Sequence, residues 1–259
     1  MTGFIDTHCH IIPAVDDGSP DEQTSIEMGM IAAADGISII VATPHITEGV
    51  YDGSDRDEQI SRLKQRFGEN DIDIQLVPGA EVPMSACISA KREALEKLAI
   101  GGGPYLLVET GEATPEQMGQ AAYSVRLAGL YPVFAHPERT MLAQRHPDQL
   151  AEIISRNEAW VQVTAASIDG LFGKPAKKTW EQMAKAGLVH LIGSDAHSSR
   201  VRAPRLSGSY RQLSNLVGEK AAGIIMLENP QQLLAGEKMR SPEAFVQPSG
   251  GSIWSRLRR

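Results

Sequence analysis

The chain has 259 residues, of which 42% are hydrophobic, and a formal net charge of −7 at pH 7. This length suits one large α/β domain with a sizeable core, and the acidic balance gives no support to a nucleic-acid partner. No apolar run is long enough to span a bilayer, no secretory signal is visible and the chain has two cysteines, so we expect no stable membrane insertion and a cytoplasmic location.

Strand-like apolar runs alternate with amphipathic helical stretches along the chain. We predict strands at residues 4–7, 38–43, 74–78, 105–109, 132–135, 160–164 and 189–193. We predict helices at residues 21–35, 56–67, 88–98, 115–127, 147–156, 175–186, 204–216 and 230–235. Ser19 is expected to cap the first helix, with Pro20 in its first turn and Glu22 completing a capping box.

The alternation of seven strand–helix units predicts a parallel sheet with both faces buried. A closed barrel and an open doubly wound sheet both fit this pattern. We favour the barrel because polar side chains follow nearly every strand, whereas an open sheet concentrates them near one point. We assign residues 1–237 to this domain and residues 238–259, with their prolines, glycines and basic end, to a flexible tail outside the core.

Side chains that bind metals follow six of the seven predicted strands. They are His8 and His10, with Asp16 and Asp17 in the loop beyond, then His45, Glu81, Glu109, His136, and finally Asp195 and His197. In a parallel barrel these strand ends converge on one rim, where such enzymes keep their active sites. Any one of these residues alone is more often structural, but gathering so much charge is costly without a compensating cation.

The number of donors indicates more than one divalent ion. His8 and His10 point to the same face of an extended strand and can hold one ion between them. Nitrogen and oxygen donors without thiolate suit Mn, Fe, Zn or Mg. A carboxylate such as Glu81 can bridge two ions, and such a pair lowers the pKa of a bound water for hydrolysis. Cys9 alternates away from the histidine face, and we interpret it, like Cys87, as a packing residue.

Three arginines lie close to the predicted rim. Arg139 follows His136 by three residues, and Arg200 and Arg202 lie just past His197. Guanidinium groups match the oxygens of a phosphate, so together they favour a phosphate ester as substrate, although each alone is as often part of a surface salt bridge.

The remaining polar residues receive structural interpretations. His146 lies in a polar loop and His190 within a predicted strand. Asp6 shares the strand face of the first two histidines, and it either orients a ligand or makes a plain hydrogen bond inside the barrel.

The motifs, in their order, resemble those of the PHP (polymerase and histidinol phosphatase) superfamily, and more narrowly the bacterial manganese-dependent protein-tyrosine phosphatases of capsule and exopolysaccharide clusters. They are His8-Cys9-His10, Asp16-Asp17-Gly18, Ala42-Thr43-Pro44-His45, Gly79-Ala80-Glu81, Ala135-His136-Pro137-Glu138-Arg139 and Ser194-Asp195-Ala196-His197. The resemblance runs from residue 4 to about residue 236. It implies a distorted (β/α)7 TIM-like barrel that holds two or three divalent metal ions, with Mn expected first and Fe, Zn or Mg as alternatives.

The resemblance also implies a role for each site residue. His8, His10, Glu81 and Asp195 would hold the first ion; Glu81, Glu109 and His136 the second; and His45, His197 and Asp17, preferred over Asp16, the third. Arg139 and Arg202 would contact the phosphate, whereas Arg200 has no clear counterpart in the family. A ring not fully engaged with metal, His45 or His197, would supply the leaving-group proton.

We therefore expect a metal-dependent phosphatase that hydrolyses phosphotyrosine in proteins by direct attack of a metal-bound hydroxide, while the arginines stabilise charge on the phosphoryl oxygens. The family's partner would be the phosphorylated tail of a bacterial tyrosine kinase that controls polysaccharide export. The oligomeric state is left open. A cysteine-dependent phosphatase is disfavoured, because neither cysteine is followed by an arginine after five intervening residues.

Three other functions remain as alternatives. They are a phosphatase of a small molecule such as histidinol phosphate, a metal-dependent nuclease, and a metal-loaded binding protein without turnover. An amidohydrolase is disfavoured because Glu109 stands where a carboxylated lysine would be expected.

Overall fold

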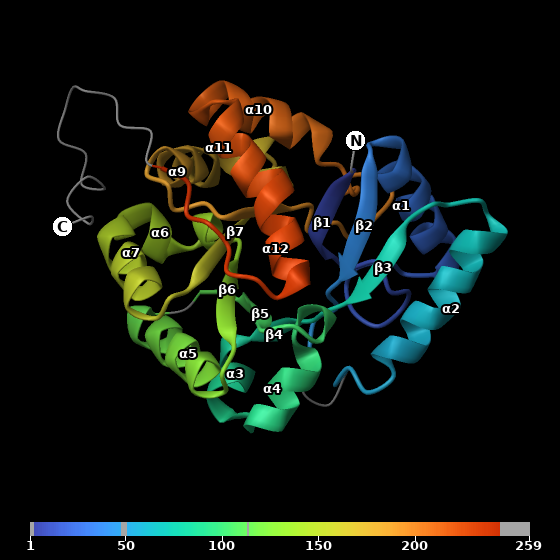
Figure 1. The fold of residues 1–259 in the computed structure, drawn as a ribbon, viewed down its shortest axis with the longest axis horizontal. Coiled ribbons are helices and arrows are strands. Elements are labelled where there is room, and N and C mark those ends of the chain that lie inside the picture. Colours follow the sequence, from blue (N-terminus) through green and yellow to red (C-terminus); the bar gives the residue numbers. More distant parts are fainter. Residues whose placement is uncertain (1–2, 48–50, 113, 244–259) are drawn as a thin grey trace.

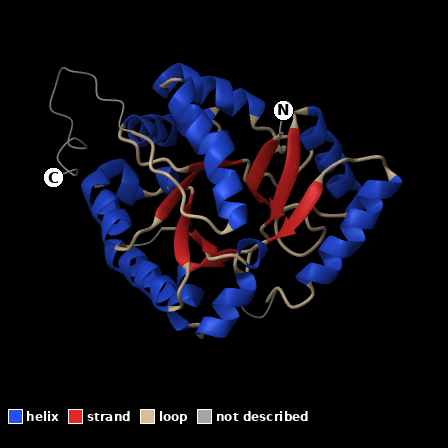
Figure 2. Cartoon of the chain, in the orientation of Figure 1, coloured by secondary structure: helices blue, strands red, loops and turns tan. Residues whose placement is uncertain are grey.

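Strands gather at the centre of the molecule and helices surround them (Figure 1, Figure 2). The computed structural model describes residues 3–47, 51–112 and 114–243. The strands are β1 (Phe4–Cys9), β2 (Ile37–Ala42), β3 (Gln75–Pro78), β4 (Glu81–Pro83), β5 (Tyr105–Glu109), β6 (Tyr131–Ala135), β7 (Trp160–Thr164) and β8 (Leu191–Gly193). The α-helices are α1 (Glu22–Ala34), α2 (Arg56–Glu69), α3 (Met84–Ser89), α4 (Arg92–Leu98), α5 (Pro115–Leu127), α6 (Met141–Arg145), α7 (Pro147–Arg156), α8 (Ala165–Ile168), α9 (Gly173–Lys185), α10 (Ser207–Val217), α11 (Glu219–Gly223) and α12 (Asn229–Ala235). Shorter segments are the 3-10 turns η1 (Ile100–Gly102) and η2 (Pro137–Arg139) and the π-helical η3 (Ile224–Glu228).

The strands close into a barrel made of two parallel arcs. One arc has the order β1–β2–β3 and the other the order β4–β5–β6–β7–β8. Backbone hydrogen bonds join the arcs at both seams: the His10 N–H donates to Ala196 O (2.9 Å), and the Ile46 N–H donates to Glu81 O (3.0 Å). The predicted barrel is confirmed, and the open sheet is excluded.

The third predicted strand, residues 74–78, is interrupted and resumes as β4. A Cβ on Gly79 would lie 2.7 Å from Val41 Cγ1, so the chain passes too close to β2 for a larger side chain. The Gly79 carbonyl accepts a hydrogen bond from the buried guanidinium of Arg56 (3.2 Å) and not from a strand. Eight short strands therefore occupy seven strand positions of the barrel.

Most predicted helices agree with the structure to within three residues, but one differs. Residues 88–98 do not form one helix, because Ala90 and Lys91 are extended and separate α3 from α4. The Ser19 cap is also wrong. Asp21 caps α1, since its carboxylate accepts a backbone N–H of the first turn (2.7 Å), while the buried Ser19 hydroxyl donates to the Asp21 carbonyl (2.9 Å).

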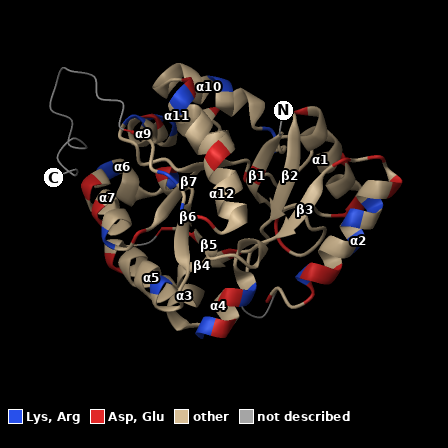
Figure 3. Ribbon diagram, in the orientation of Figure 1, with Lys and Arg blue, Asp and Glu red and all other residues tan. Residues whose placement is uncertain are grey.

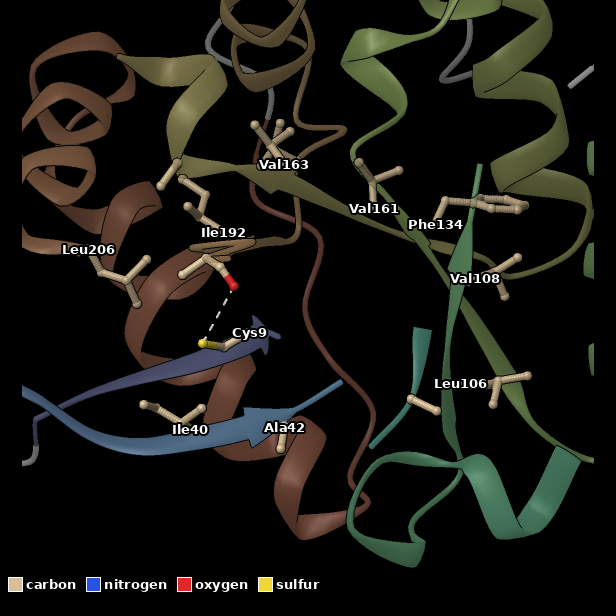
Figure 4. Packing of buried hydrophobic residues seen from close by; sticks show 14 of the residues in the cluster. Cys9, Ile40, Ala42, Leu106, Val108, Phe134, Val161, Val163, Ile192 and Leu206 are labelled. Atoms are coloured by element: carbon tan, nitrogen blue, oxygen red, sulfur yellow. Dashed lines mark hydrogen bonds between the residues drawn. The ribbon is translucent and has the colours of Figure 1, made fainter. Parts of the chain in front are cut away.

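Apolar side chains cover both faces of the strands, as in other buried parallel sheets. On the outer face they pack against the helices, and Figure 4 shows Cys9, Ile40, Ala42, Leu106, Val108, Phe134, Val161, Val163 and Ile192 in this cluster. Their neighbours along the strands form a second cluster, which includes Val41, Tyr105, Leu107, Val133 and Leu191 and fills part of the barrel interior. Cys9 thus faces away from the histidines that flank it, as predicted.

The chain continues past residue 237 along the barrel. The Tyr105 hydroxyl donates to Glu237 O (2.5 Å) and accepts the Met239 N–H (3.2 Å), and Met239 belongs to the interior cluster. The Arg240 N–H donates to Asn229 Oδ1 (2.8 Å). The domain boundary at residue 237 stays a prediction, and most of the predicted tail, residues 244–259, lies outside the described residues.

Charged residues lie mainly on the outer helices and in loops, and the strands at the centre contain few (Figure 3). Within the described ranges, no helix is both long and apolar enough to cross a membrane.

Candidate metal centre

Two imidazoles at the end of β1 meet two carboxylates from other strands. His8 Nε2 lies 3.0 Å from His10 Nε2 and 3.1 Å from Glu81 Oε2. Asp195 Oδ1 lies 3.6 Å from the Nε2 atoms of both histidines. The four residues predicted to share the first ion are all buried. Their donor atoms fall into two groups that share His8, one with His10 and Glu81 and the other with His136 and Asp195.

The backbone at the strand ends aims these side chains. His136 follows β6 with φ of 40°, and Asp195 follows β8 with φ of 51°. This left-handed conformation is uncommon for residues other than glycine, and it concentrates at functional sites. The Asp195 N–H also donates to His8 O (2.8 Å) across the seam of the barrel. The contacts that close the barrel therefore also position the site.

The buried carboxylates are held ionised by the imidazoles around them. Burial alone would raise the pKa of Glu81, but the charges of His8 and His136 lower it well below its usual value. Burial of His10 would lower its pKa, but hydrogen bonds to Asp16 and Glu81 raise it to about 10. Without metal, protons on the imidazoles compensate the charge of the carboxylates, and a bound metal ion would take the place of those protons.

A second group of donors surrounds Asp17 at the rim. Asp17 Oδ1 lies 3.3 Å from His197 Nε2 and 3.6 Å from His45 Nε2. Together with His10, these residues offer ligand atoms that lie within 4.8 Å of one another. Asp17 is exposed, whereas Asp16 turns toward His10. This geometry favours Asp17 over Asp16 as the aspartate of the predicted third set.

His136 contacts Glu81 directly, whereas Glu109 and Glu81 both lie near His45. His136 Nε2 lies 2.8 Å from Glu81 Oε1. Glu109 Oε2 lies 3.8 Å from His45 Nδ1, which is itself 3.4 Å from Glu81 Oε2. Among the described residues, the donor atoms group as His8, His136 and Asp195, and as His45, Glu81 and Glu109. The assignment of Glu81, Glu109 and His136 to one ion stays a prediction.

Hydrogen bonds to the Nδ1 atoms of His8 and His10 fix the orientation of their rings. His8 Nδ1 lies 2.7 Å from Gln162 Oε1, and His10 Nδ1 lies 2.7 Å from Asp16 Oδ2. Partners of this kind set the tautomer of a metal-binding histidine. Gln162 was not among the predicted site residues. The sequence does contain a feature that could have identified it: Gln162 is a polar residue between two valines in the apolar run of β7.

Two arginines lie at the rim beside Asp195. Asp195 Oδ2 accepts hydrogen bonds from Arg139 Nη1 (3.1 Å), Arg202 Nη2 (2.6 Å) and Thr164 Oγ1 (3.1 Å). The guanidinium carbon of Arg139 lies 4.1 Å, and that of Arg202 5.6 Å, from the centre of the Phe172 ring. Both arginine side chains stay partly exposed, so the pair can receive an anion beside the metal-type donors. Phe172 was not predicted, because a single phenylalanine carries no signal for such a position.

The residues interpreted as structural lie apart from the donors. His190 is buried, its Nδ1 accepts the Val161 N–H (3.1 Å), and burial lowers its pKa to about 3. His146 is exposed, and both cysteines are buried free thiols. Arg200, the third arginine that the sequence places near the rim, is exposed, and its backbone N–H donates to a serine hydroxyl (3.3 Å); its role stays open.

Asp6 holds two backbone segments together. Its Oδ1 accepts the N–H groups of Ser194 (2.8 Å) and His8 (3.3 Å), and burial raises its pKa to about 6. This is the geometry of a hydrogen bond inside the barrel, one of the two predicted roles.

The donor set fits divalent cations. Ligand atoms about 2.0–2.2 Å from one ion lie roughly 3 Å from each other, and the Nε2 atoms of His8 and His10 are 3.0 Å apart. Imidazole nitrogens and carboxylate oxygens are donors that Mn, Fe and Zn accept. The site can therefore hold metal ions next to a pair of arginines, an arrangement suited to hydrolysis of a phosphate ester.

The sequence as a whole matches one family. The model of capsular polysaccharide synthesis proteins of the CpsB/CapC type matches residues 4–235. The chain belongs to the CpsB/CapC family. Tyrosine-protein phosphatase YwqE of Bacillus subtilis is 33% identical over 252 residues, which cover 95% of each chain. Tyrosine-protein phosphatase CpsB of Streptococcus agalactiae is 26% identical over 239 residues, 89% of this chain and 98% of that one.

Solved structures agree with this membership. A chain from the crystal structures of YwqE from Bacillus subtilis and CpsB from Streptococcus pneumoniae, two metal-dependent tyrosine phosphatases, superposes with a TM-score of 0.84 at 31% identity. That match covers 94% of this chain and 100% of the other. The phosphotriesterase homology protein from Escherichia coli matches with a TM-score of 0.54 at 12% identity, which shows a shared barrel fold alone. The predicted family and fold class are thus confirmed.

Proposed function

We propose that this CpsB/CapC protein is a metal-dependent protein-tyrosine phosphatase. The observation that carries the proposal is the convergence of nine metal-type donors and two arginines at one end of the barrel. Relatives named tyrosine-protein phosphatase, which are similar over nearly the whole chain, support phosphotyrosine as the substrate class.

The donors would hold two or three ions, with manganese as the first candidate. We assign His8, His10, Glu81 and Asp195 to one ion, Glu81, Glu109 and His136 to a second, and Asp17, His45 and His197 to a third. When bound, the ions would lower the pKa of a water molecule to supply the nucleophile and would polarise the phosphoryl oxygens.

Arg139 and Arg202 bind the phosphate in this proposal. Both guanidinium groups contact Asp195 Oδ2, and both side chains are partly exposed. Their remaining N–H groups are the donors that would bind the phosphoryl oxygens. Fixed donors of this kind stabilise the charge that develops in phosphoryl transfer.

His45 or His197 would protonate the departing tyrosine oxygen in this proposal. Both rings lie beside Asp17 at the rim, and the His45 side chain is about a quarter exposed. Either ring can act as the general acid only where it is not fully engaged with the third ion.

The physiological substrate in this proposal is the phosphorylated tail of a bacterial tyrosine kinase of polysaccharide export. The family description, capsular polysaccharide synthesis, supports that context. Both cysteines are free and buried, as expected for a protein of the reducing cytoplasm.

A substrate panel tests the proposal. With manganese present, kcat/KM for a phosphotyrosine peptide should exceed that for histidinol phosphate, and bis(p-nitrophenyl) phosphate, a nuclease-type diester, should be the poorest substrate. His136→Ala should abolish turnover with an unchanged far-UV circular dichroism spectrum. Preference for histidinol phosphate or for the diester would overturn the assignment, and a fully active His136→Ala variant would remove that residue from the site.

A further inference from the structure

A groove opens beside the candidate metal centre. It has a volume of about 520 Å³, within the range of roughly 300–1,000 Å³ typical of ligand sites. Its lining comes from the end of β4 and from α3, from the end of β5 and the residues just after it, and from the first turn of α5. The lining residues are Pro83, Met84, Ser85, Ile88, Glu109, Gly111, Glu112 and Gln117.

The groove is continuous with the metal centre through Glu109. Glu109 lines the groove, and its Oε2 lies 3.8 Å from His45 Nδ1. His45 in turn lies 3.4 Å from Glu81 Oε2, at the heart of the donor cluster. A peptide with its phosphate at the metal centre therefore has this groove as a neighbouring place for its next residues.

One wall of the groove is apolar and adaptable. It is formed by Pro83, Met84 and Ile88, and Ile88 is 41% exposed although it is a large aliphatic residue. Methionine side chains are flexible and accommodate varied apolar partners. This wall suits one apolar side chain of a bound peptide.

The other wall is acidic. Among the described lining residues, the charged ones are Glu109 and Glu112, and both are negative. Across the site, Arg139 and Arg202 supply positive charge beside Asp195. The charges therefore complement a ligand with a phosphate at the arginines and a basic side chain at the glutamates. Charge complementarity of this kind determines specificity more than affinity.

We propose that this groove binds the residues that flank the phosphotyrosine of a peptide substrate: an apolar side chain on Pro83, Met84 and Ile88, and a lysine or arginine at Glu112. The inference rests on the proposed function, because it presumes that a phosphotyrosine peptide is the substrate. It adds a specificity site outside the metal donors. The protein should prefer substrates in which an apolar residue and a basic residue follow or precede the phosphotyrosine.

The experiment compares peptides with p-nitrophenyl phosphate, which has no residues on either side of its phosphorylated ring. Three phosphotyrosine peptides are used, with Leu-Lys, Leu-Glu or Gly-Gly next to the phosphotyrosine, each made in both chain directions. Wild-type protein should prefer a Leu-Lys peptide. Ile88→Ala should lower kcat/KM for that peptide about fivefold and leave p-nitrophenyl phosphate turnover within twofold. Glu112→Lys should reverse the preference toward Leu-Glu.

Matched variants away from the groove serve as controls. Leu127→Ala removes a side chain that is 67% exposed on α5, and Glu93→Lys reverses an exposed charge on α4. Neither should change peptide preference. Equal kcat/KM for the three peptides, or an equal loss on peptide and p-nitrophenyl phosphate in the groove variants, would overturn the groove proposal. Failure of wild-type protein on every phosphotyrosine substrate would instead overturn the proposed function.

Discussion

The geometry of the metal centre depends on side chains that form hydrogen bonds to the predicted ligands. Gln162 contacts the Nδ1 side of His8, and Asp16 contacts that of His10, each at 2.7 Å. Both partners leave the Nε2 atoms directed at the donor cluster. Replacing such a partner should therefore loosen metal binding while the ligands themselves remain.

Gln162→Leu tests this at one residue. Leucine keeps the size of the side chain but cannot accept the His8 hydrogen bond, so we expect metal affinity to fall about 10- to 100-fold. Equilibrium dialysis against manganese gives the dissociation constants. Gln120→Leu, at an exposed position of α5, should bind metal like the wild type. An unchanged affinity in Gln162→Leu would show that the hydrogen bond does not orient the ligand.

His190 is a buried histidine whose effect on stability should depend on pH. Burial lowers its pKa to about 3, against 6.5 for an exposed histidine. Between these values the unfolded chain binds a proton that the folded protein excludes, so stability falls as pH drops below about 6.5. Each pH unit in that window costs about 1.4 kcal/mol, or about 2 kcal/mol between pH 7 and pH 5.

The measurement compares wild type with His190→Gln by urea unfolding at pH 7 and pH 5. His190→Gln should be less stable than the wild type at both pH values, because packing is lost. From pH 7 to pH 5, however, the free energy of unfolding of the variant should fall by about 2 kcal/mol less than that of the wild type. Equal pH dependence in the two proteins would show that His190 is not excluded from protonation in the folded state.

At the scale of elements, the site is built where the two arcs of the barrel meet. β8 approaches β1 at one seam, and β4 approaches the segment after β2 at the other. The bridged pairs Cys9–Ala196 and His45–Glu81 lie next to or within the donor set. A disturbance of either seam should therefore affect metal binding and stability together.

Gly193 of β8 tests this coupling. A Cβ there would lie 2.7 Å from His8 Cβ and 3.0 Å from Gln162 Cδ, so Gly193→Ala must displace one of them. We expect a loss of about 1–3 kcal/mol in unfolding free energy, together with weaker manganese binding. Chemical denaturation and metal titration measure the two effects.

Gly119→Ala is the matched control. Gly119 lies within α5 and a Cβ there meets nothing within 4 Å. This substitution should raise stability by about 0.5–1 kcal/mol, because alanine loses less backbone entropy in a helix. If Gly193→Ala instead matched its control in both measurements, the seam would not position the ligands.

The sequence predicted the bounds of strands and helices correctly where the pattern of apolar residues was continuous or where a capping motif marked the start of the helix. β5, β7 and α5 have the predicted bounds, because each is a clean apolar run or begins with a Thr114–Pro115 cap. The break after β3 could not be predicted, because it depends on the approach of Val41 and on the guanidinium of Arg56, which are brought there by the fold.

At the scale of the whole molecule, strand order explains why the candidate site was visible in the sequence. Each predicted ligand lies near the end of a predicted strand or in the loop beyond it, and a closed parallel barrel brings the carboxyl ends of its strands to one rim. The assignment of Glu81, Glu109 and His136 to one ion stays a prediction, because the order of the strands does not fix the directions of these side chains. Phe172 was missed for a similar reason, since its contact with the two arginines is made across the fold.

The dependence of catalysis on metal is measured by the metal content of the purified protein together with phosphotyrosine-peptide turnover before and after chelation. We expect two to three divalent ions per chain, loss of turnover when a chelator removes them, and recovery when manganese is returned. Turnover that persists in protein shown to be free of metal would exclude metal-dependent hydrolysis at this site.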